Sequence, residues 1–439
     1  MDKIVICGGS PLHGEIPISG SKNSALPIMA ATLLTDEKCI IKNVADLHDI
    51  KTMKLLLEQL GKKVFVQEDV ITIQTDPAFM GDDAPVEAPY DLVRKMRASI
   101  CVLGPLLAKR KRAKVSLPGG CVIGPRPVDL HIKALSALGA QIEVIHGFVT
   151  AEAPNLKGCD FVLEGKFGSS VLGTANMMMC AVLAEGKTII RSAACEPEVK
   201  DLASFLKSMG ANIKGEGTKV IEIEGVKILK GAEHRVIADR IETGTYLLAA
   251  AVAGGEIKLT GVISEHVMAL IYALKQAGQD CLVQKDSITI KGNKVFSPVS
   301  IETIPYPGFA TDLQAQMCAL LCFAKGTSVI TEKIYPDRFM YISELNRMGA
   351  NIVFDAGKAI VKGIDKLFGA DVMASDLRAS AALVIAGLAA EGITKISRVY
   401  HLDRGYEKLE AKLAAVGANI SRISEQEESP LVMQEELVN

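Results

Sequence analysis

The sequence predicts an α/β protein built from six copies of one unit of about 70 residues. One short sequence phrase occurs six times. It consists of apolar residues at helical spacing, followed by a glycine and then by a strand-like run. Leucine and alanine at three- and four-residue spacing predict amphipathic helices, and β-branched runs predict strands. Each unit is therefore expected to hold two helices and about four strands. The glycines of the phrase lie 68 to 78 residues apart: Gly61, Gly139, Gly210, Gly278, Gly349 and Gly417.

Each of these glycines is expected to end its helix in the left-handed conformation. A second phrase, glycine followed by alternating β-branched residues, predicts a turn into a strand. It occurs as AEGKTII from Ala184, GGEIKLTG from Gly254, AKGTSVI from Ala324 and AEGITKI from Ala390. Six similar units are expected to assemble as two groups of three, joined by the stretch from Gly225 to Ile241. Shared ligands usually bind in the cleft between two such domains.

The composition excludes several classes of partner. The 439 residues carry a formal charge of -2, with cations and anions nearly balanced, so neither nucleic acid nor an anionic membrane would find a broad basic surface. The ten cysteines form no CxxC pair and no disulfide-like rhythm, and no apolar run is long enough to cross a membrane. A soluble cytoplasmic protein is therefore expected. Residues 424–439 are acidic and lack a periodic apolar pattern, which predicts a disordered tail.

One loop presents a thiol. The segment SLPGGCVIGPRPVDLH, residues 116–131, contains prolines and glycines at spacings that exclude helix and strand around Cys121. Arg126 in the same loop favours the thiolate, and Asp129 can hold a polar ligand. The alternative is that Cys121 is a structural residue of a glycine-rich turn.

Cationic residues are spread over both halves of the sequence. Lys22 and Asn23 lie in GSKNSALP, a turn leading into a helix whose N-terminal amides suit an anion. Together the cations predict a clamp for a ligand that carries a phosphate and a carboxylate, provided the two halves close around it. The alternative is a set of ordinary surface salt bridges. The arginines of the clamp are Arg97, Arg126, Arg338, Arg378 and Arg404.

Candidates for acid and base chemistry are aspartates. Asp312 follows a proline-glycine turn and opens a helix, so it is either a general base or an N-cap residue. Asp376 and Asp403 precede arginines and are expected to orient them, and Asp49 is a weaker candidate of the same kind. The histidines are scattered, and Cys318 with Cys322 suits core packing better than ligation. No phosphate-binding or dinucleotide-binding motif is present, so neither a metal nor a cofactor is expected.

Seven segments resemble the enolpyruvyl transferase family: GSKNSALP, MRAS, LPGGCVIGPRPVDLH, DRIETGTYLLAAA, TDLQAQ, SDLRAS and HLDRGYE. The resemblance runs from about residue 3 to residue 423. It implies two inside-out α/β domains, each of three βαβαββ units with helices inside and sheets outside. It also implies that the first domain spans 22–236 and that residues 1–21 join 237–423 in the second domain.

The resemblance also implies the reaction. An enolpyruvyl group passes from phosphoenolpyruvate to the 3'-hydroxyl of UDP-N-acetylglucosamine with release of phosphate, the first committed step of peptidoglycan precursor synthesis. Asp312 is the expected base, Cys121 the expected acid and the site alkylated by fosfomycin, and Lys22 and Arg404 the other catalytic residues. The residues implied to bind substrate are Lys22, Asn23, Arg97, Arg126, Pro127, Val128, Asp129, Leu130, Lys166, Phe167, Gly168, Ser169, Asp312, Ile334, Arg338, Arg378 and Arg404.

Three alternatives stay open at the level of sequence. The nearest is the shikimate 3-phosphate enolpyruvyl transferase, which lacks the cysteine loop in this form. RNA 3'-phosphate cyclase uses related fold units, but the sequence shows neither a basic RNA-binding surface nor a candidate for the adenylated histidine. A nucleotide-sugar-binding regulatory protein without activity is the third, and the joint presence of the lysine, cysteine, aspartate and arginines argues against it.

Overall fold

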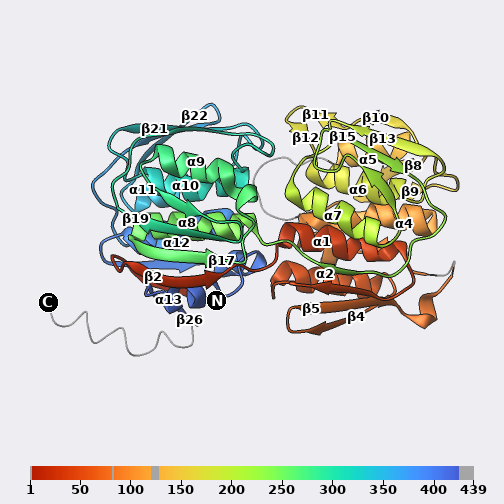
Figure 1. The fold of residues 1–439 in the computed structure, drawn as a ribbon, viewed down its shortest axis with the longest axis horizontal. Coiled ribbons are helices and arrows are strands. Elements are labelled where there is room, and N and C mark those ends of the chain that lie inside the picture. Colours follow the sequence, from red (N-terminus) through yellow and green to blue (C-terminus); the bar gives the residue numbers. More distant parts are fainter. Residues whose placement is uncertain (1, 82–83, 120–127, 425–439) are drawn as a thin grey trace.

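A computed structural model describes residues 2–81, 84–119 and 128–424 (Figure 1). The buried apolar residues form two separate cores. One core extends from Ala25 to Val236, and we call the elements around it lobe one. The other contains Ile4 to Ile18 together with Ala238 to Ile420, and we call the elements around it lobe two.

Lobe one carries three four-stranded sheets in its described part, and each contains one parallel and two antiparallel pairs. Every sheet therefore repeats the same strand pattern. The first has the order β16 (Glu233–Arg235), β3 (Cys39–Lys42), β5 (Val70–Thr75), β4 (Lys62–Gln67). The second has the order β6 (Glu87–Ala88), β7 (Arg112–Ser116), β9 (Phe148–Glu152), β8 (Gln141–Ile145). The third has the order β10 (Asp160–Val162), β13 (Lys187–Arg191), β15 (Val220–Glu224), β14 (Asn212–Lys214), and a small hairpin joins β11 (Glu164–Gly165) to β12 (Gly168–Ser169).

Lobe two repeats the pattern with strands from both ends of the chain. Figure 1 shows β2 beside β17, although β2 is close to the N-terminus. One sheet has the order β18 (Cys281–Val283), β19 (Ser287–Gly292), β17 (Gly255–Thr260), β2 (Leu12–Pro17). The next has the order β20 (Ser300–Thr303), β21 (Thr327–Glu332), β23 (Lys358–Lys362), β22 (Asn351–Asp355). The last has the order β24 (Asp371–Met373), β25 (Ile393–Ser397), β1 (Lys3–Cys7), β26 (Asn419–Ile423).

The centre of each lobe is helical. The central helices are buried on nearly every residue, whereas the outer helices bury one face only, as their alternation of apolar and polar residues predicts. The inside-out α/β arrangement is thereby confirmed. The central helices are α1 (Lys22–Ala31), α4 (Leu103–Arg110), α6 (Val171–Ala181), α8 (Arg240–Ala253), α10 (Gln314–Leu321) and α12 (Leu377–Ala389). The others are α2 (His48–Gln59), α3 (Tyr90–Val93), α5 (Asp129–Ala137), α7 (Pro197–Ser208), α9 (Met268–Gln276), α11 (Ile342–Arg347) and α13 (Leu409–Ala415).

The six glycines of the repeated phrase all adopt positive φ, between 84° and 106°, directly after a helix. The prediction that they end their helices in the left-handed region is confirmed, because residues with a Cβ rarely adopt this conformation. The second phrase is also confirmed as the entry to a strand. Its four copies lead into β13, β17, β21 and β25.

The chain passes between the lobes twice, and the two passages are hydrogen-bonded to each other. The amide of Ser21 donates to the carbonyl of Ile237 over 2.7 Å, and the amide of Asp239 donates to the carbonyl of Ser19 over 2.9 Å. Gly20 is the residue between these bonds, and a Cβ there would lie 1.7 Å from the carbonyl oxygen of Asn43. Only glycine therefore fits this close approach.

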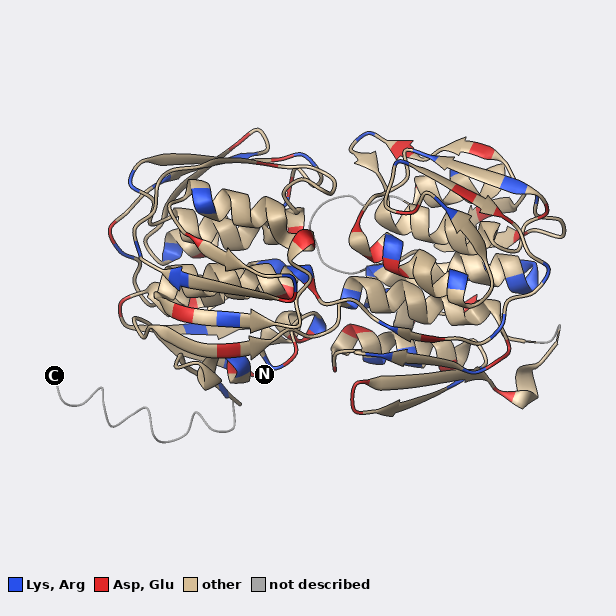
Figure 2. Cartoon of the chain, viewed as in Figure 1, with Lys and Arg blue, Asp and Glu red and all other residues tan. Residues whose placement is uncertain are grey.

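Charged side chains are distributed over both lobes with the two signs interspersed (Figure 2), in keeping with the balanced composition. The central helices are largely uncharged: α6 and α10 carry no charged residue, α1, α8 and α12 carry charges in their first turn, and α4 carries them in its last turn. No helix in the described residues has the length and apolar character that crossing a bilayer requires.

Lys62 in β4 gives the first prediction. Its side chain is buried, its amine donates to the Thr35 carbonyl and the Thr75 hydroxyl, and burial lowers its pKa to about 8. An unfolded lysine titrates near 10.4, so above pH 8 the unfolded chain binds more protons and stability rises with pH. Relative to Lys62→Met, the parent should gain about 2–3 kcal/mol between pH 7.5 and pH 10 in urea unfolding. A difference that does not change with pH would contradict this.

Candidate active site

A buried carboxylate joins two cations that come from opposite lobes. The Lys22 ammonium lies 3.0 Å from Asp49 Oδ2, and Arg404 donates through Nε to Asp49 Oδ1 over 2.9 Å. Lys22 is the first residue of α1 and Asp49 lies in the first turn of α2, both in lobe one. Arg404 ends the 3-10 helix η6 (Val399–Arg404) of lobe two. This triad carries one net positive charge at the junction of the lobes.

The triad keeps Asp49 ionised. Burial by itself raises the pKa of Asp49, but the charges of Lys22 and Arg404, with their hydrogen bonds, hold that pKa below its ordinary value. Because one carboxylate is shared by two cations, the pair retains attraction for a further anion. An anionic ligand bound here would contact both lobes at once.

A second cluster of two cations and one carboxylate lies in lobe two. Asp312, in the 3-10 helix η5 (Thr311–Leu313), accepts from Arg338 over 2.7 Å and from Arg378 over 2.8 Å. Burial raises the pKa of Asp312, but the charges of Arg378 and Arg338 outweigh it and hold that pKa well below the ordinary value. Arg378 Nη1 is buried and has no hydrogen-bond partner among the described residues. This cluster also carries one net positive charge.

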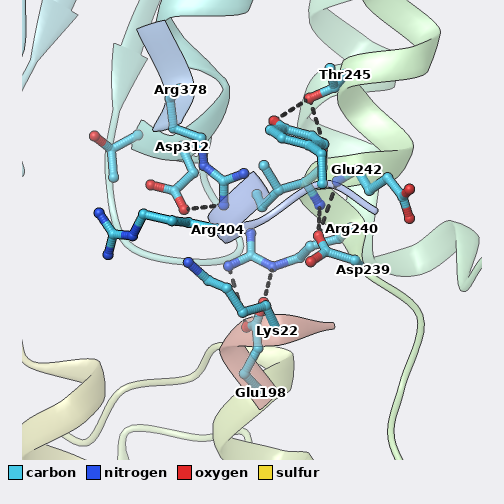
Figure 3. Close-up of polar contacts among 12 residues, drawn as sticks. Lys22, Glu198, Asp239, Arg240, Glu242, Thr245, Asp312, Arg378 and Arg404 are labelled. Carbon is cyan, nitrogen blue, oxygen red and sulfur yellow. Dashed lines mark hydrogen bonds and ion pairs between the residues drawn. The ribbon is translucent and has the colours of Figure 1, made fainter. Parts of the chain in front are cut away.

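A network of polar side chains holds the Arg338–Asp312–Arg378 cluster in position. The Tyr406 hydroxyl lies 2.8 Å from Thr245 Oγ1 and accepts from Gln316 Nε2 over 3.2 Å. The same amide of Gln316 donates to the main-chain carbonyl of Asp312 over 2.9 Å. The Arg378 guanidinium lies over the Tyr406 ring at 5.4 Å. These contacts fix the guanidinium and the carboxylate relative to α8, α10 and α12 (Figure 3).

Asp312 is not a helix cap. Both of its oxygens accept from arginines, and in the described part of the chain neither accepts from the main-chain amides that begin η5 or α10. The interpretation of Asp312 as an N-cap is therefore wrong. Asp376 is the capping residue instead, since its carboxylate accepts from the amides of Arg378 and Ala379 at the start of α12. Asp403 does orient an arginine, but that arginine is Arg422 of β26 and not Arg404.

The other predicted substrate-binding residues line lobe one and one loop of lobe two. Asn23 follows Lys22 in α1, and Arg97 begins the 3-10 helix η3 (Arg97–Val102). Val128 precedes α5, and Asp129 and Leu130 are the first residues of that helix. Lys166 and Phe167 form the exposed turn between β11 and β12, and Gly168 and Ser169 form β12. Ile334 follows β21. Cys121, Arg126 and Pro127 lie outside the described residues.

A contact between the lobes that the sequence did not predict involves Arg240. Its guanidinium, at the start of α8, binds both carboxylate oxygens of Glu198 in α7, at 2.9 and 3.3 Å (Figure 3). The Arg240 guanidinium also lies 5.7 Å from the centroid of the Tyr306 ring. Arg240 lies in the segment DRIETGTY, which resembles the enolpyruvyl transferase family. No charge pattern in the sequence, however, indicates that Arg240 pairs with a residue as distant along the chain as Glu198.

Across residues 2–81, 84–119 and 128–424, no group of three histidine, cysteine or acidic side chains is arranged to hold a metal ion. Cys318 and Cys322 are both buried in the core of lobe two as free thiols. The Cys322 thiol donates to the Cys318 carbonyl one turn earlier in the helix. Their expected role in packing is confirmed.

The fold is that of known enolpyruvyl transferases. It matches the enolpyruvyl transferase NikO of Streptomyces tendae with a TM-score of 0.85 at 23% identity, covering 96% of this chain and 98% of that one. It matches an EPSP synthase of Acinetobacter baumannii with a TM-score of 0.73 at 19% identity, covering 97% and 100%. The model of the EPSP synthase (3-phosphoshikimate 1-carboxyvinyltransferase) family matches residues 6–413.

Sequence relatives give a closer assignment. A UDP-N-acetylglucosamine 1-carboxyvinyltransferase of Methylacidiphilum infernorum is 53% identical, over 96% of this chain and 99% of the relative. One of Carboxydothermus hydrogenoformans is 51% identical, over 97% of this chain and 100% of the relative. The chain belongs to the UDP-N-acetylglucosamine 1-carboxyvinyltransferases, a family of transferase enzymes.

The shared carboxylate of the triad gives a second prediction. Asp49→Asn preserves shape but leaves Lys22 and Arg404 without their common counter-ion, which should cost about 3 kcal/mol and lower the thermal midpoint. Inorganic phosphate, exchanged for chloride at constant ionic strength, should raise the midpoint of the variant more than that of the parent. Asp46→Asn removes an exposed pair with Lys51 and should behave like the parent. An equal phosphate effect in parent and Asp49→Asn would contradict the anion-binding role of the triad.

Proposed function

We propose that this protein transfers the enolpyruvyl group of phosphoenolpyruvate to the 3'-hydroxyl of UDP-N-acetylglucosamine and releases phosphate. The proposal is supported by the two net-positive clusters, Lys22–Asp49–Arg404 and Arg338–Asp312–Arg378. They occur in a chain that belongs to the UDP-N-acetylglucosamine 1-carboxyvinyltransferase family. Phosphoenolpyruvate carries a carboxylate and a phosphate, and the nucleotide sugar carries a diphosphate. Cations held at fixed positions in a partly buried site suit such ligands.

The reaction is an addition followed by an elimination. The 3'-oxygen bonds to C2 of phosphoenolpyruvate while C3 takes a proton and the hydroxyl gives one up, forming a tetrahedral phospho-ketal. C3 then loses a proton, the C2–C3 double bond forms again, and the bond from C2 to the phosphate oxygen breaks. Negative charge on the carboxylate and on the departing phosphate is stabilised by Lys22 and Arg404, to which Arg126 adds a third cation in the proposed site.

Asp312 takes the proton of the hydroxyl in this mechanism. A carboxylate held by two arginines is ionised at neutral pH but is a weak base. Arg338 and Arg378 are also proposed to bind the substrate, so a ligand that draws either guanidinium away from Asp312 strengthens the base at the moment it is needed. Cys121 acts as the general acid or in product release.

The reaction is proposed to take place in the cytoplasm as the first committed step of peptidoglycan precursor synthesis. It would thereby contribute to cell-wall formation, cell shape and cell division. Fosfomycin is proposed to alkylate Cys121. The test of the function is phosphate release from phosphoenolpyruvate with UDP-N-acetylglucosamine, with shikimate 3-phosphate and with neither acceptor. Release that requires the nucleotide sugar supports the proposal. Release that requires shikimate 3-phosphate, or no release, contradicts it.

Asp312→Asn should reduce phosphate release about 100- to 10,000-fold, because an amide cannot take the hydroxyl proton. The variant should still bind UDP-N-acetylglucosamine in calorimetry, although loss of the charge between two arginines should lower its thermal midpoint. Asp376→Asn is the matched control, since asparagine caps helices as well as aspartate does. Phosphate release by Asp312→Asn at the rate of the Asp376→Asn control would show that Asp312 is not the base.

Cys121→Ser should lose most of its turnover at pH 7, since a hydroxyl is a far weaker acid than a thiol close to an arginine. Intact-mass measurement should show a fosfomycin adduct on the parent, formed faster with UDP-N-acetylglucosamine, and none on the serine variant. An adduct on another cysteine, or parental turnover by the variant, would refute the role of Cys121.

A further inference from the structure

The carboxylate of Glu407 in lobe two contacts two segments that are distant from it in the sequence. Its Oε1 accepts from the main-chain amide of Asp46 in lobe one over 3.0 Å. Its Oε2 accepts from the Ser19 hydroxyl over 3.0 Å, and Ser19 lies on one of the two passages between the lobes. One carboxylate therefore holds a lobe-one loop and a passage between the lobes.

This contact runs parallel to the ion pair of the triad. Asp46 lies in the loop before α2, three residues before Asp49. Glu407 lies three residues after Arg404, the last residue of η6. The same two short segments are thus joined twice, once through Arg404 and Asp49 and once through Glu407 and the amide of Asp46.

The segment from Arg404 to Glu407 is anchored between its two contacts by Tyr406. Tyr406 between them is buried, with its hydroxyl bonded to Thr245 and Gln316. The main-chain amide of Tyr406 donates to the carbonyl of Leu402. A shift of Glu407 away from Asp46 therefore carries Arg404 away from Asp49 and Lys22.

Hydrogen bonds around Ser19 direct its hydroxyl group towards Glu407. The Lys412 ammonium donates to the Ser19 hydroxyl oxygen over 2.7 Å, which directs the hydroxyl proton to Glu407. Lys412 also pairs with Glu242, whose second oxygen accepts from the Ser19 amide. By contrast Glu410, one turn further along the chain, pairs with Arg422 inside lobe two and forms no hydrogen bond or ion pair with lobe one among the described residues.

We propose that Glu407 is a positioning residue for phosphoenolpyruvate, which places Arg404 against Lys22 by joining its segment to the loop before α2. The inference rests on the proposed function for the identity of the substrate. Glu407 itself does not touch the substrate, and its effect passes entirely through Arg404.

A double-mutant cycle in KM tests this. Glu407→Ala should raise the KM for phosphoenolpyruvate about tenfold and leave the KM for UDP-N-acetylglucosamine within about twofold. Arg404→Ala should raise the first KM about 30- to 150-fold, and the double variant should be no worse than Arg404→Ala alone. Glu407→Gln should recover part of the loss, because its amide oxygen can still accept from Asp46. Glu410→Ala is the matched control, with parental KM values for both substrates.

Effects of Glu407→Ala and Arg404→Ala that multiply, or an unchanged KM in Glu407→Ala, would overturn the inference. Inorganic phosphate provides a readout that does not depend on turnover. Exchanged for chloride at constant ionic strength, it should raise the thermal midpoint of the parent and Glu410→Ala but raise that of Glu407→Ala much less. If the parent shows no turnover, the proposed function fails, and an equal phosphate effect in all three proteins would still refute the role of Glu407.

Discussion

The site depends on one constraint: each buried carboxylate is placed between two cations, so that positive charge exceeds negative charge in both clusters. Asp49 and Asp312 each lie between two cations, so neither cluster is neutral and neither is fully repulsive. Without the carboxylates, neighbouring cations in a poorly solvated place would repel one another strongly. With them, the protein folds with the cations already in position, and a dianionic ligand can complete the neutralisation. Preorganisation of this kind avoids the cost of assembling charges during the reaction.

The repeat architecture explains how chain segments so far apart supply one site. In the described residues each lobe has three central helices, and three of the six begin at reactive groups: Lys22 begins α1, Arg378 lies in the first turn of α12 and Asp312 lies in the 3-10 helix η5 that leads into α10. Helix N-termini also favour anions. The outer strands and helices bury the apolar faces of the central helices, and the polar helix ends lie at the junction of the lobes. The architecture therefore separates stability, carried by the sheets and cores, from chemistry, carried by helix ends.

The fold was largely predictable, and the contacts within the site were not. Glycines at regular spacing and strand phrases of period two are local signals, and local signals predicted six units, their caps and their strands. Which cation meets which carboxylate depends on packing between segments that lie from 26 to 355 residues apart in the sequence. Thus Asp312 looked like a cap because of its place after a turn, whereas Arg338 and Arg378 claim both its oxygens. Asp49 looked peripheral, and Glu198 and Glu407 gave no signal, because their partners come from the other lobe.

The pairing of β1 and β2 has a consequence for synthesis on the ribosome. Ile4 in β1 lies opposite Ile396 in β25, and Leu12 in β2 lies opposite Gly255 in β17. During synthesis β1 and β2 therefore precede their partner strands by more than 200 residues, and lobe one can complete its sheets before those partners are made. Closing such long loops slows folding and leaves apolar strand edges open in the meantime. Of the two lobes, lobe two is thus the one whose sheets stay incomplete until the end of the described chain has been made.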